Sequence, residues 1–286
     1  MYALNRSKFI GYVTEKPELR TIPSGMEVCD VNIRVISKVI KEDGSVFNST
    51  SFHTATFWGG IAKTVGSYTD AGSQIYIEGR LKTDSWQGDD GKARYKTKII
   101  AEDLILLSRR DGDYPALNST VVGTGLNEVE LIGNITKDVE LRETTSGHSV
   151  ASTSIATNRK WKNRQTNEFQ EETEFHNIVL WGDLATEAAK NVSKGSKVYI
   201  KGRLQNRSWD TPEGEKRYTT EVIVESISAL GHEAPASMNS ENYAAPAKAV
   251  TAKPAPVAQK EEVETSTPDL PTISYESDIK PEDLPF

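Results

Sequence analysis

Residues 195–209 read GSKVYIKGRLQNRSW, and residues 72–86 read GSQIYIEGRLKTDSW. The two stretches start 123 residues apart and are identical at nine of their fifteen positions. A period of this length is too long for a solenoid repeat, so it indicates a duplicated domain. We therefore read the chain as two copies of one unit, followed by a C-terminal segment of different composition.

Apolar and polar residues alternate along each of these stretches. In the second copy, Val198, Ile200 and Leu204 share one parity. The opposite parity carries three cations and an aromatic ring: Lys201, Arg203, Arg207 and Trp209. Since successive side chains of a strand point to opposite faces, the stretch predicts a strand with one buried face and one cationic face. A cationic face that bears an aromatic ring is typical of surfaces that bind a flexible polyanion with flat bases.

The first copy repeats this plan, and a preceding strand adds further rings in both copies. Opposite its aliphatic residues the first copy carries Arg80, Lys82 and Trp86. The preceding strand places two rings six residues apart on one parity: Phe52 and Trp58 in the first copy, Phe175 and Trp181 in the second. Six residues of a strand span about 20 Å. This length suits several stacked nucleotides rather than one small ligand.

The order of elements predicts the fold class. Each copy reads as five strands with one short helix between the third and the fourth, which is the order of the OB-fold barrel. The helix is expected over 61–68 in the first copy, where it is the shorter, and over 183–192 in the second, with Asp183 as its cap. We therefore predict an all-β protein with two tandem OB-fold five-stranded barrels, residues 1–110 and 126–233, joined by a connector over 111–125. One helix per five strands argues against a parallel α/β sheet.

The segment after the second copy has a different composition. Ala, Pro, Ser, Thr, Lys and Glu dominate from about residue 234, and apolar periodicity stops, which predicts a disordered linker over 234–275. An acidic tip over 276–286 follows it. The tip ends in a group that predicts partner binding: Glu282, Asp283, Leu284, Pro285 and Phe286. A terminal ring with its free carboxylate would dock as an aromatic anchor beside a basic rim.

Charge and composition limit the functions that the chain can have. The net charge is −7, but residues 1–110 carry 16 Lys and Arg against 13 Asp and Glu, while residues 234–286 carry 4 against 9. The connector and the C-terminal segment supply the whole deficit, so polyanion binding depends on how charge is sorted onto one face. The chain has one cysteine, no long apolar run and no apolar signal core near its start, from which we expect a cytoplasmic protein.

The remaining candidate residues surround Trp161. Arg159 and Lys160 precede it in a polar stretch that we predict to be a loop. All five tryptophans of the chain fall on predicted binding positions; tryptophans are usually largely buried, but strand parity argues against a core role for four of these. His53 and His176 alternate with the aromatic parity and are expected to point toward the core or a subunit contact. We find no catalytic, metal or cofactor motif and predict none of these sites.

These residues together resemble the bacterial single-stranded DNA-binding proteins, in the subgroup with two OB-folds per chain. The resemblance is carried by the Gly-Ser-x-Val/Ile-Tyr-Ile-x-Gly-x-Leu strand, the Phe-His and Trp-Gly pairs, and the terminal Asp-Leu-Pro-Phe. It implies that Trp161, Phe175, Trp181 and Trp209 stack on bases, whereas the first copy has Val39 in place of Trp161. It also implies that the tip recruits replication, recombination and repair proteins, and that the chain forms a homodimer with four barrels.

The predicted function is sequence-tolerant binding of single-stranded DNA by a protein that is not an enzyme. Two rivals stay open on the residues alone. A nuclease or hydrolase on the same barrels would need clustered carboxylates or histidines at the binding face, and an RNA-binding module would use the same rings and cations. Because the first copy is more cationic and the second has more rings, we further expect the first to supply more salt-sensitive attraction and the second more stacking.

Overall fold

A computed structural model describes residues 3–40, 44–88, 91–108, 125–163, 166–210 and 216–231. The linker predicted over 234–275, the tip over 276–286 and all of the predicted connector except Gly125 lie outside the described residues. Within them, no helix is long and apolar enough to cross a membrane.

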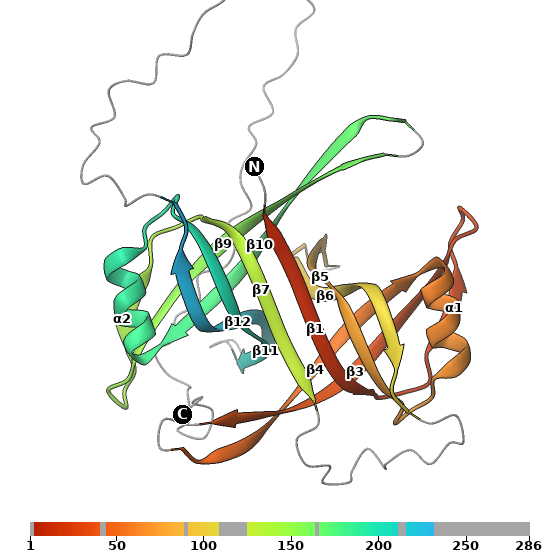
Figure 1. The fold of residues 1–286 in the computed structure, drawn as a ribbon, viewed down its shortest axis with the longest axis horizontal. Coiled ribbons are helices and arrows are strands. Elements are labelled where there is room, and N and C mark those ends of the chain that lie inside the picture. The colour runs from red at the N-terminus through yellow and green to blue at the C-terminus, as the bar shows by residue number, and fades with distance from the viewer. Residues whose placement is uncertain are drawn as a thin grey trace, which may run out of the picture.

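The described residues form twelve strands and two helices, in the same order in both copies (Figure 1). The elements of the first copy are β1 (Leu4–Val13), β2 (Glu18–Thr21), β3 (Glu27–Ile40), β4 (Val46–Trp58), α1 (Gly59–Tyr68), β5 (Gln74–Gln87) and β6 (Ala93–Leu106). Those of the second copy are β7 (Leu126–Ile135), β8 (Glu140–Glu143), β9 (Ser149–Lys162), β10 (Phe169–Trp181), α2 (Gly182–Asn191), β11 (Lys197–Asp210) and β12 (Lys216–Ala229).

Each copy closes into a barrel. In the first, β1 pairs with β3, β3 with β4, β4 in parallel with β6, β6 with β5, and β5 again with β1. The second copy repeats this circuit from β7 through β9, β10, β12 and β11. The all-β prediction of two five-stranded OB-fold barrels is therefore confirmed. The short strands β2 and β8 were not predicted as separate elements. They lie outside the circuit and pair with β3 and β9.

Residues 195–209, whose repeat indicated the duplication, bury the side chains of the predicted apolar parity inside the barrel. Val198 and Ile200 are fully buried and Leu204 nearly so. A β-bulge between Lys201 and Gly202 brings β12 close, so that a Cβ atom on Gly202 would lie 2.1 Å from the carbonyl oxygen of Ile223. The glycine of this strand is thus needed for closure, because any larger residue would collide with backbone.

Both helices begin one residue after a tryptophan. Gly59 and Gly182 are the first residues of the two helices. Their φ angles are 59° and 57°, which is the left-handed region that favours glycine. The predicted cap at Asp183 is wrong: Trp181 is the N-cap residue, and Asp183 lies in the first turn, where a carboxylate still favours the helix dipole. The expectation of a shorter first helix is also wrong, since α1 and α2 each have ten residues. Both helices therefore start at the Trp-Gly pair, although the residues that follow it differ between the copies.

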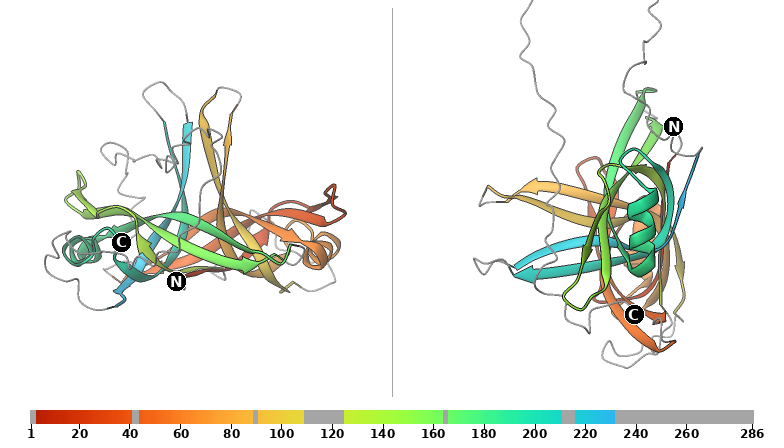
Figure 2. Two further views of the ribbon diagram at one scale, coloured as in Figure 1. Left: turned by 90° about the horizontal axis from the view of Figure 1, so that it is seen from above. Right: turned by 90° about the vertical axis from the view of Figure 1, so that its left-hand side faces the viewer.

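The two barrels join through their first strands. β1 and β7 pair antiparallel, with Leu4 opposite Ile132 and Ile10 opposite Leu126, so equivalent positions exchange across the junction. Strand pairing is continuous through both barrels, because β1 and β7 lie side by side (Figure 1). The two barrels are seen next to each other in Figure 2. The long hairpins β3–β4 and β9–β10 each contact the other barrel: the Asn206 side chain donates to the backbone oxygen of Phe52, and the Thr83 amide donates to Glu174.

Candidate nucleic-acid interface

Among the described strand residues, five large aromatic side chains are at least 40% exposed. They are Phe52 (56%), Trp58 (40%), Trp86 (48%), Phe169 (69%) and Tyr218 (72%). Rings this open to water gain little from folding and mark a binding surface when several occur together. Three of the five are residues that the sequence analysis selected. Phe169 and Tyr218 were missed, although Phe169 is the one apolar residue in the polar run NEFQEE, a signal that could have found it.

The other predicted rings are half-buried. Trp161, Phe175, Trp181 and Trp209 all fall between exposed and buried. Trp181 packs against a small apolar cluster of Val150, Val179 and Ile223, so it contributes to stability as well as to the surface.

The loop predicted around Trp161 is wrong. Trp161 lies on β9, opposite Gln170 of β10, and the hairpin ladder continues to Lys162 opposite Phe169. Cross-strand backbone pairing therefore extends the strand through a segment whose sequence is almost entirely polar.

Cations lie over several of these rings. The Arg159 guanidinium carbon is 5.1 Å from the centre of the Trp161 ring, and that of Arg207 is 5.9 Å from the Trp209 ring. The Lys160 ammonium lies 5.3 Å from the Phe169 ring. These cation–π distances place a positive charge next to each of the three rings, where a base and its phosphate would both find a partner.

Arg80, Lys82 and Arg203 are less free than the sequence suggested. The Arg80 side chain is 15% exposed and lies 3.5 Å from Glu102 and 3.8 Å from Glu172. Lys82 forms an ion pair with Glu172. Arg203 is 11% exposed and lies 3.7 Å from Glu225. Burial lowers the pKa of both guanidinium groups, but each has a carboxylate beside it.

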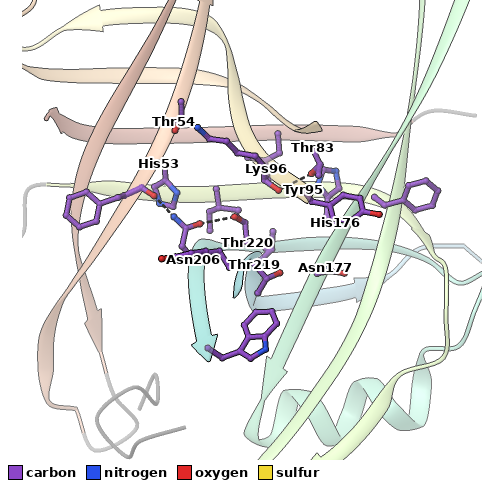
Figure 3. Close-up of a pocket in the computed structure, with 18 residues that line it drawn as sticks. His53, Thr54, Thr83, Tyr95, Lys96, His176, Asn177, Asn206, Thr219 and Thr220 are labelled. Carbon is purple, nitrogen blue, oxygen red and sulfur yellow. Dashed lines mark hydrogen bonds between the residues drawn. The ribbon is translucent and has the colours of Figure 1, made fainter. Parts of the chain in front are cut away.

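A cavity of about 240 Å³ lies between the barrels and is lined by both copies (Figure 3). Phe52, Phe175 and Trp209 contribute rings, and Lys96 contributes a cation. The amide oxygen of Asn206 accepts from the Thr220 hydroxyl at 2.9 Å. The cavity therefore offers aromatic and hydrogen-bonding groups together, which is the mixture that a nucleotide requires.

His53 and His176 line this cavity from the two different barrels (Figure 3). They are 6% and 4% exposed, and burial lowers the pKa of each to about 4. His53 Nε2 lies 2.9 Å from Ser51 Oγ, and His176 Nε2 lies 3.1 Å from Thr157 Oγ1. Both are thus neutral, hydrogen-bonded residues on the core side of their strands, as expected. In the described part of the chain, no group of three His, Cys, Asp or Glu residues could hold a metal ion.

The profile of the Single-strand binding protein family matches residues 4–107 and residues 126–230. The chain belongs to the single-strand binding protein family. Its two matches coincide with the two barrels, and the family is one of binding proteins rather than enzymes.

Relatives and solved structures agree with this family. The chain is 32% identical over 221 residues to a single-stranded DNA-binding protein of Thermus thermophilus, covering 77% of this chain and 81% of that one. It is 32% identical over 233 residues to one from Deinococcus radiodurans, covering 79% and 75%. The crystal structure of the wild-type protein from Thermus aquaticus matches with a TM-score of 0.63 and 26% identity, over 84% of this chain and 98% of that chain.

Proposed function

We propose that this protein binds single-stranded DNA without sequence preference and protects it during replication, recombination and repair. The observation that carries the proposal is the set of five exposed strand rings together with nearby cations. Lys160 lies over Phe169, which is one of the five, and Arg159 and Arg207 lie over the half-buried Trp161 and Trp209. Stacking of bases on aromatic rings contributes about 1–3 kcal/mol per base and tolerates any base.

The surface favours unpaired over paired DNA. In a duplex the base faces are covered by their neighbours, so rings such as Trp86 and Phe169 would have no partner. In a single strand each base can stack on a ring while its phosphate approaches a cation. We propose two roles for the binding residues predicted from the sequence. The rings stack on bases: Phe52, Trp58, Trp86, Trp161, Phe175, Trp181 and Trp209. The cations contact phosphates: Arg80, Lys82, Arg159, Lys160, Arg203 and Arg207.

Tryptophan fluorescence tests the proposal directly. Titration of the full chain with oligo-dT should quench the emission strongly, and a duplex of equal length should leave it almost unchanged. Equal quenching by both, or by neither, would refute the proposal. Competition between oligo-dT and oligo-U then decides the RNA alternative, because preference for oligo-U would indicate contacts to the 2′-hydroxyl.

The proposal extends to partner proteins. The tip residues Glu282 to Phe286 combine acidic groups with a terminal ring, and the resemblance to bacterial single-stranded DNA-binding proteins supports a role in recruiting replication and repair enzymes. Deletion of residues 276–286 should abolish binding to such enzymes while leaving the affinity for oligo-dT intact. Unchanged enzyme binding would remove this part of the proposal.

We also propose that the chain forms a homodimer with four barrels and works in the cytoplasm at the nucleoid. The resemblance supports this assembly, and the antiparallel β1–β7 pairing makes each chain the equivalent of two single-barrel subunits. Sedimentation equilibrium should give twice the mass of one chain. A monomer at micromolar concentration would contradict it.

A further inference from the structure

The hairpin β9–β10 of the second barrel places two carboxylates on the cations of the first. Glu172 pairs with Lys82 and lies 3.8 Å from Arg80. Glu174 lies 4.0 Å from Lys82, and its carboxylate accepts the amide of Thr83 at 3.0 Å. A hydrogen bond from Lys82 is the main reason that the pKa of Glu172 is below its usual value, so this carboxylate is charged at neutral pH.

The duplication provides an internal comparison for this contact. Arg80 is opposite Ile100 in the first barrel, as Arg203 is opposite Ile223 in the second. In the hairpins, Glu172 lies opposite Arg159 on β9, whereas Ser49 lies opposite Ser37 on β3. The repeat therefore aligns Glu172 with Ser49 and Glu174 with Ser51, and Lys82 with Gln205. The hairpin that crosses to the first barrel brings two carboxylates, and the hairpin that crosses to the second brings two hydroxyls.

We propose that Glu172 and Glu174 compete with DNA phosphate for Arg80 and Lys82, so that a single strand engages these cations only by displacing the two carboxylates. This inference rests on the proposed binding of single-stranded DNA. Guanidinium and ammonium groups bind carboxylates and phosphates with the same donors, so the two anions exclude each other at one site. Arg203, the counterpart of Arg80, lies beside Glu225 as Arg80 lies beside Glu102, but the hairpin positions equivalent to Glu172 and Glu174 carry serines.

The exchange has a consequence for salt dependence. When phosphate replaces a carboxylate on a cation, the DNA releases a counterion but the displaced carboxylate attracts one, so the exchange adds little to the salt dependence of binding. The first barrel, although richer in cations, then contributes less salt-sensitive attraction than its composition suggests. Arg159 also lies in this region, since Arg80, Arg159 and Lys160 line one cavity beside the hairpin.

The test removes the competitors by using the residues that the chain itself has at the equivalent positions. In the full chain, Glu172→Ser combined with Glu174→Ser should bind oligo-dT more tightly at low salt. The slope of log affinity against log salt should steepen by about 0.7, the contribution of one cation, because Lys82 loses both carboxylates while Arg80 keeps Glu102 at 3.5 Å. Between 0.1 M and 1 M NaCl this corresponds to a loss of affinity about 5-fold greater than in the wild type.

Two further variants separate competition from other effects. Glu140→Ser with Glu143→Ser removes the same net charge from β8, at the outer edge of the sheet, and should leave the slope unchanged. Lys82→Gln should leave the slope unchanged in the wild type but lower it by about 0.7 in the Glu172→Ser, Glu174→Ser background. This second comparison does not depend on the absolute stability of either background, which thermal unfolding measures separately.

The outcomes distinguish the two proposals. If the wild type does not bind oligo-dT, the proposed function fails. If the wild type binds, and the serine variant has the same or a shallower salt slope, the competition is refuted while the function remains. An equal effect of Lys82→Gln in both backgrounds would refute it as well. Should the double serine variant unfold, Glu172→Gln alone retains the shape of the side chain and should still steepen the slope, by up to about 0.7, because Lys82 then keeps only the more distant Glu174 of the two.

Discussion

Replacing Phe169 with alanine tests the stacking surface at its most exposed phenylalanine. The ring is 69% exposed and lies at the start of β10, opposite Lys162. The ammonium groups of Lys160 and Lys162 are 5.3 Å and 6.0 Å from the ring centre. Because most of the ring is in water, its loss removes little buried apolar area, and the free energy of unfolding should change by less than about 0.5 kcal/mol.

The affinity should change far more. If one base stacks on Phe169, the loss of about 1–3 kcal/mol raises the Kd for oligo-dT about 5-fold to 150-fold. Fluorescence anisotropy of labelled oligo-dT at constant salt measures this, and urea unfolding checks that stability is retained. Tyr68→Ala is the matched control, since Tyr68 is 58% exposed on α1 and not on a strand face. A Kd unchanged in Phe169→Ala, or raised equally in Tyr68→Ala, would refute the assignment of Phe169 to the binding surface.

Three further predictions follow from packing and burial. Trp181→Ala should raise the Kd for oligo-dT and also lower the free energy of unfolding by about 2–3 kcal/mol, because the ring packs on an apolar cluster; an affinity loss without destabilisation would contradict the packing. Gly202→Ala should lower the free energy of unfolding by about 3 kcal/mol, whereas Gly60→Ala, in helix α1 where a Cβ atom meets no other atom within 4 Å, should leave it unchanged or raise it by up to about 1 kcal/mol. Since burial lowers the pKa of His53 and His176 to about 4 from the usual 6.5, the unfolded chain binds more protons, and stability should fall as pH drops from 6.5 to 4, by up to about 3 kcal/mol per histidine. Urea unfolding across this range checks it, and His53→Gln with His176→Gln should flatten the dependence between pH 6.5 and 5.

The barrel and its duplication were predictable because both depend on local alternation. Val198, Ile200 and Leu204 had to share a face, and a strand buried on one side requires that pattern over consecutive residues. Where the prediction was wrong, a neighbouring element decided the outcome. Trp161 lies on a strand because β10 pairs with it, and Asp183 is not the cap because Gly182 turns the chain one residue earlier.

The exposure of three candidate binding residues was predictable for the same reason. Parity alone placed Phe52, Trp58 and Trp86 on the exposed face, since a side chain opposite a buried one must point outward.

Local residue patterns were enough to predict two barrels, the buried face of each strand and the positions of most rings, because these properties repeat every two residues along one segment. Which charges meet depends on the arrangement of the elements in space. Arg80 and Lys82 are 90 or more residues from Glu172 in the chain. They contact it because the β1–β7 pairing joins the two barrels, so that the β9–β10 hairpin of the second lies against β5 of the first. A contact between distant segments depends on how whole elements are placed in space, which no local pattern of residues records.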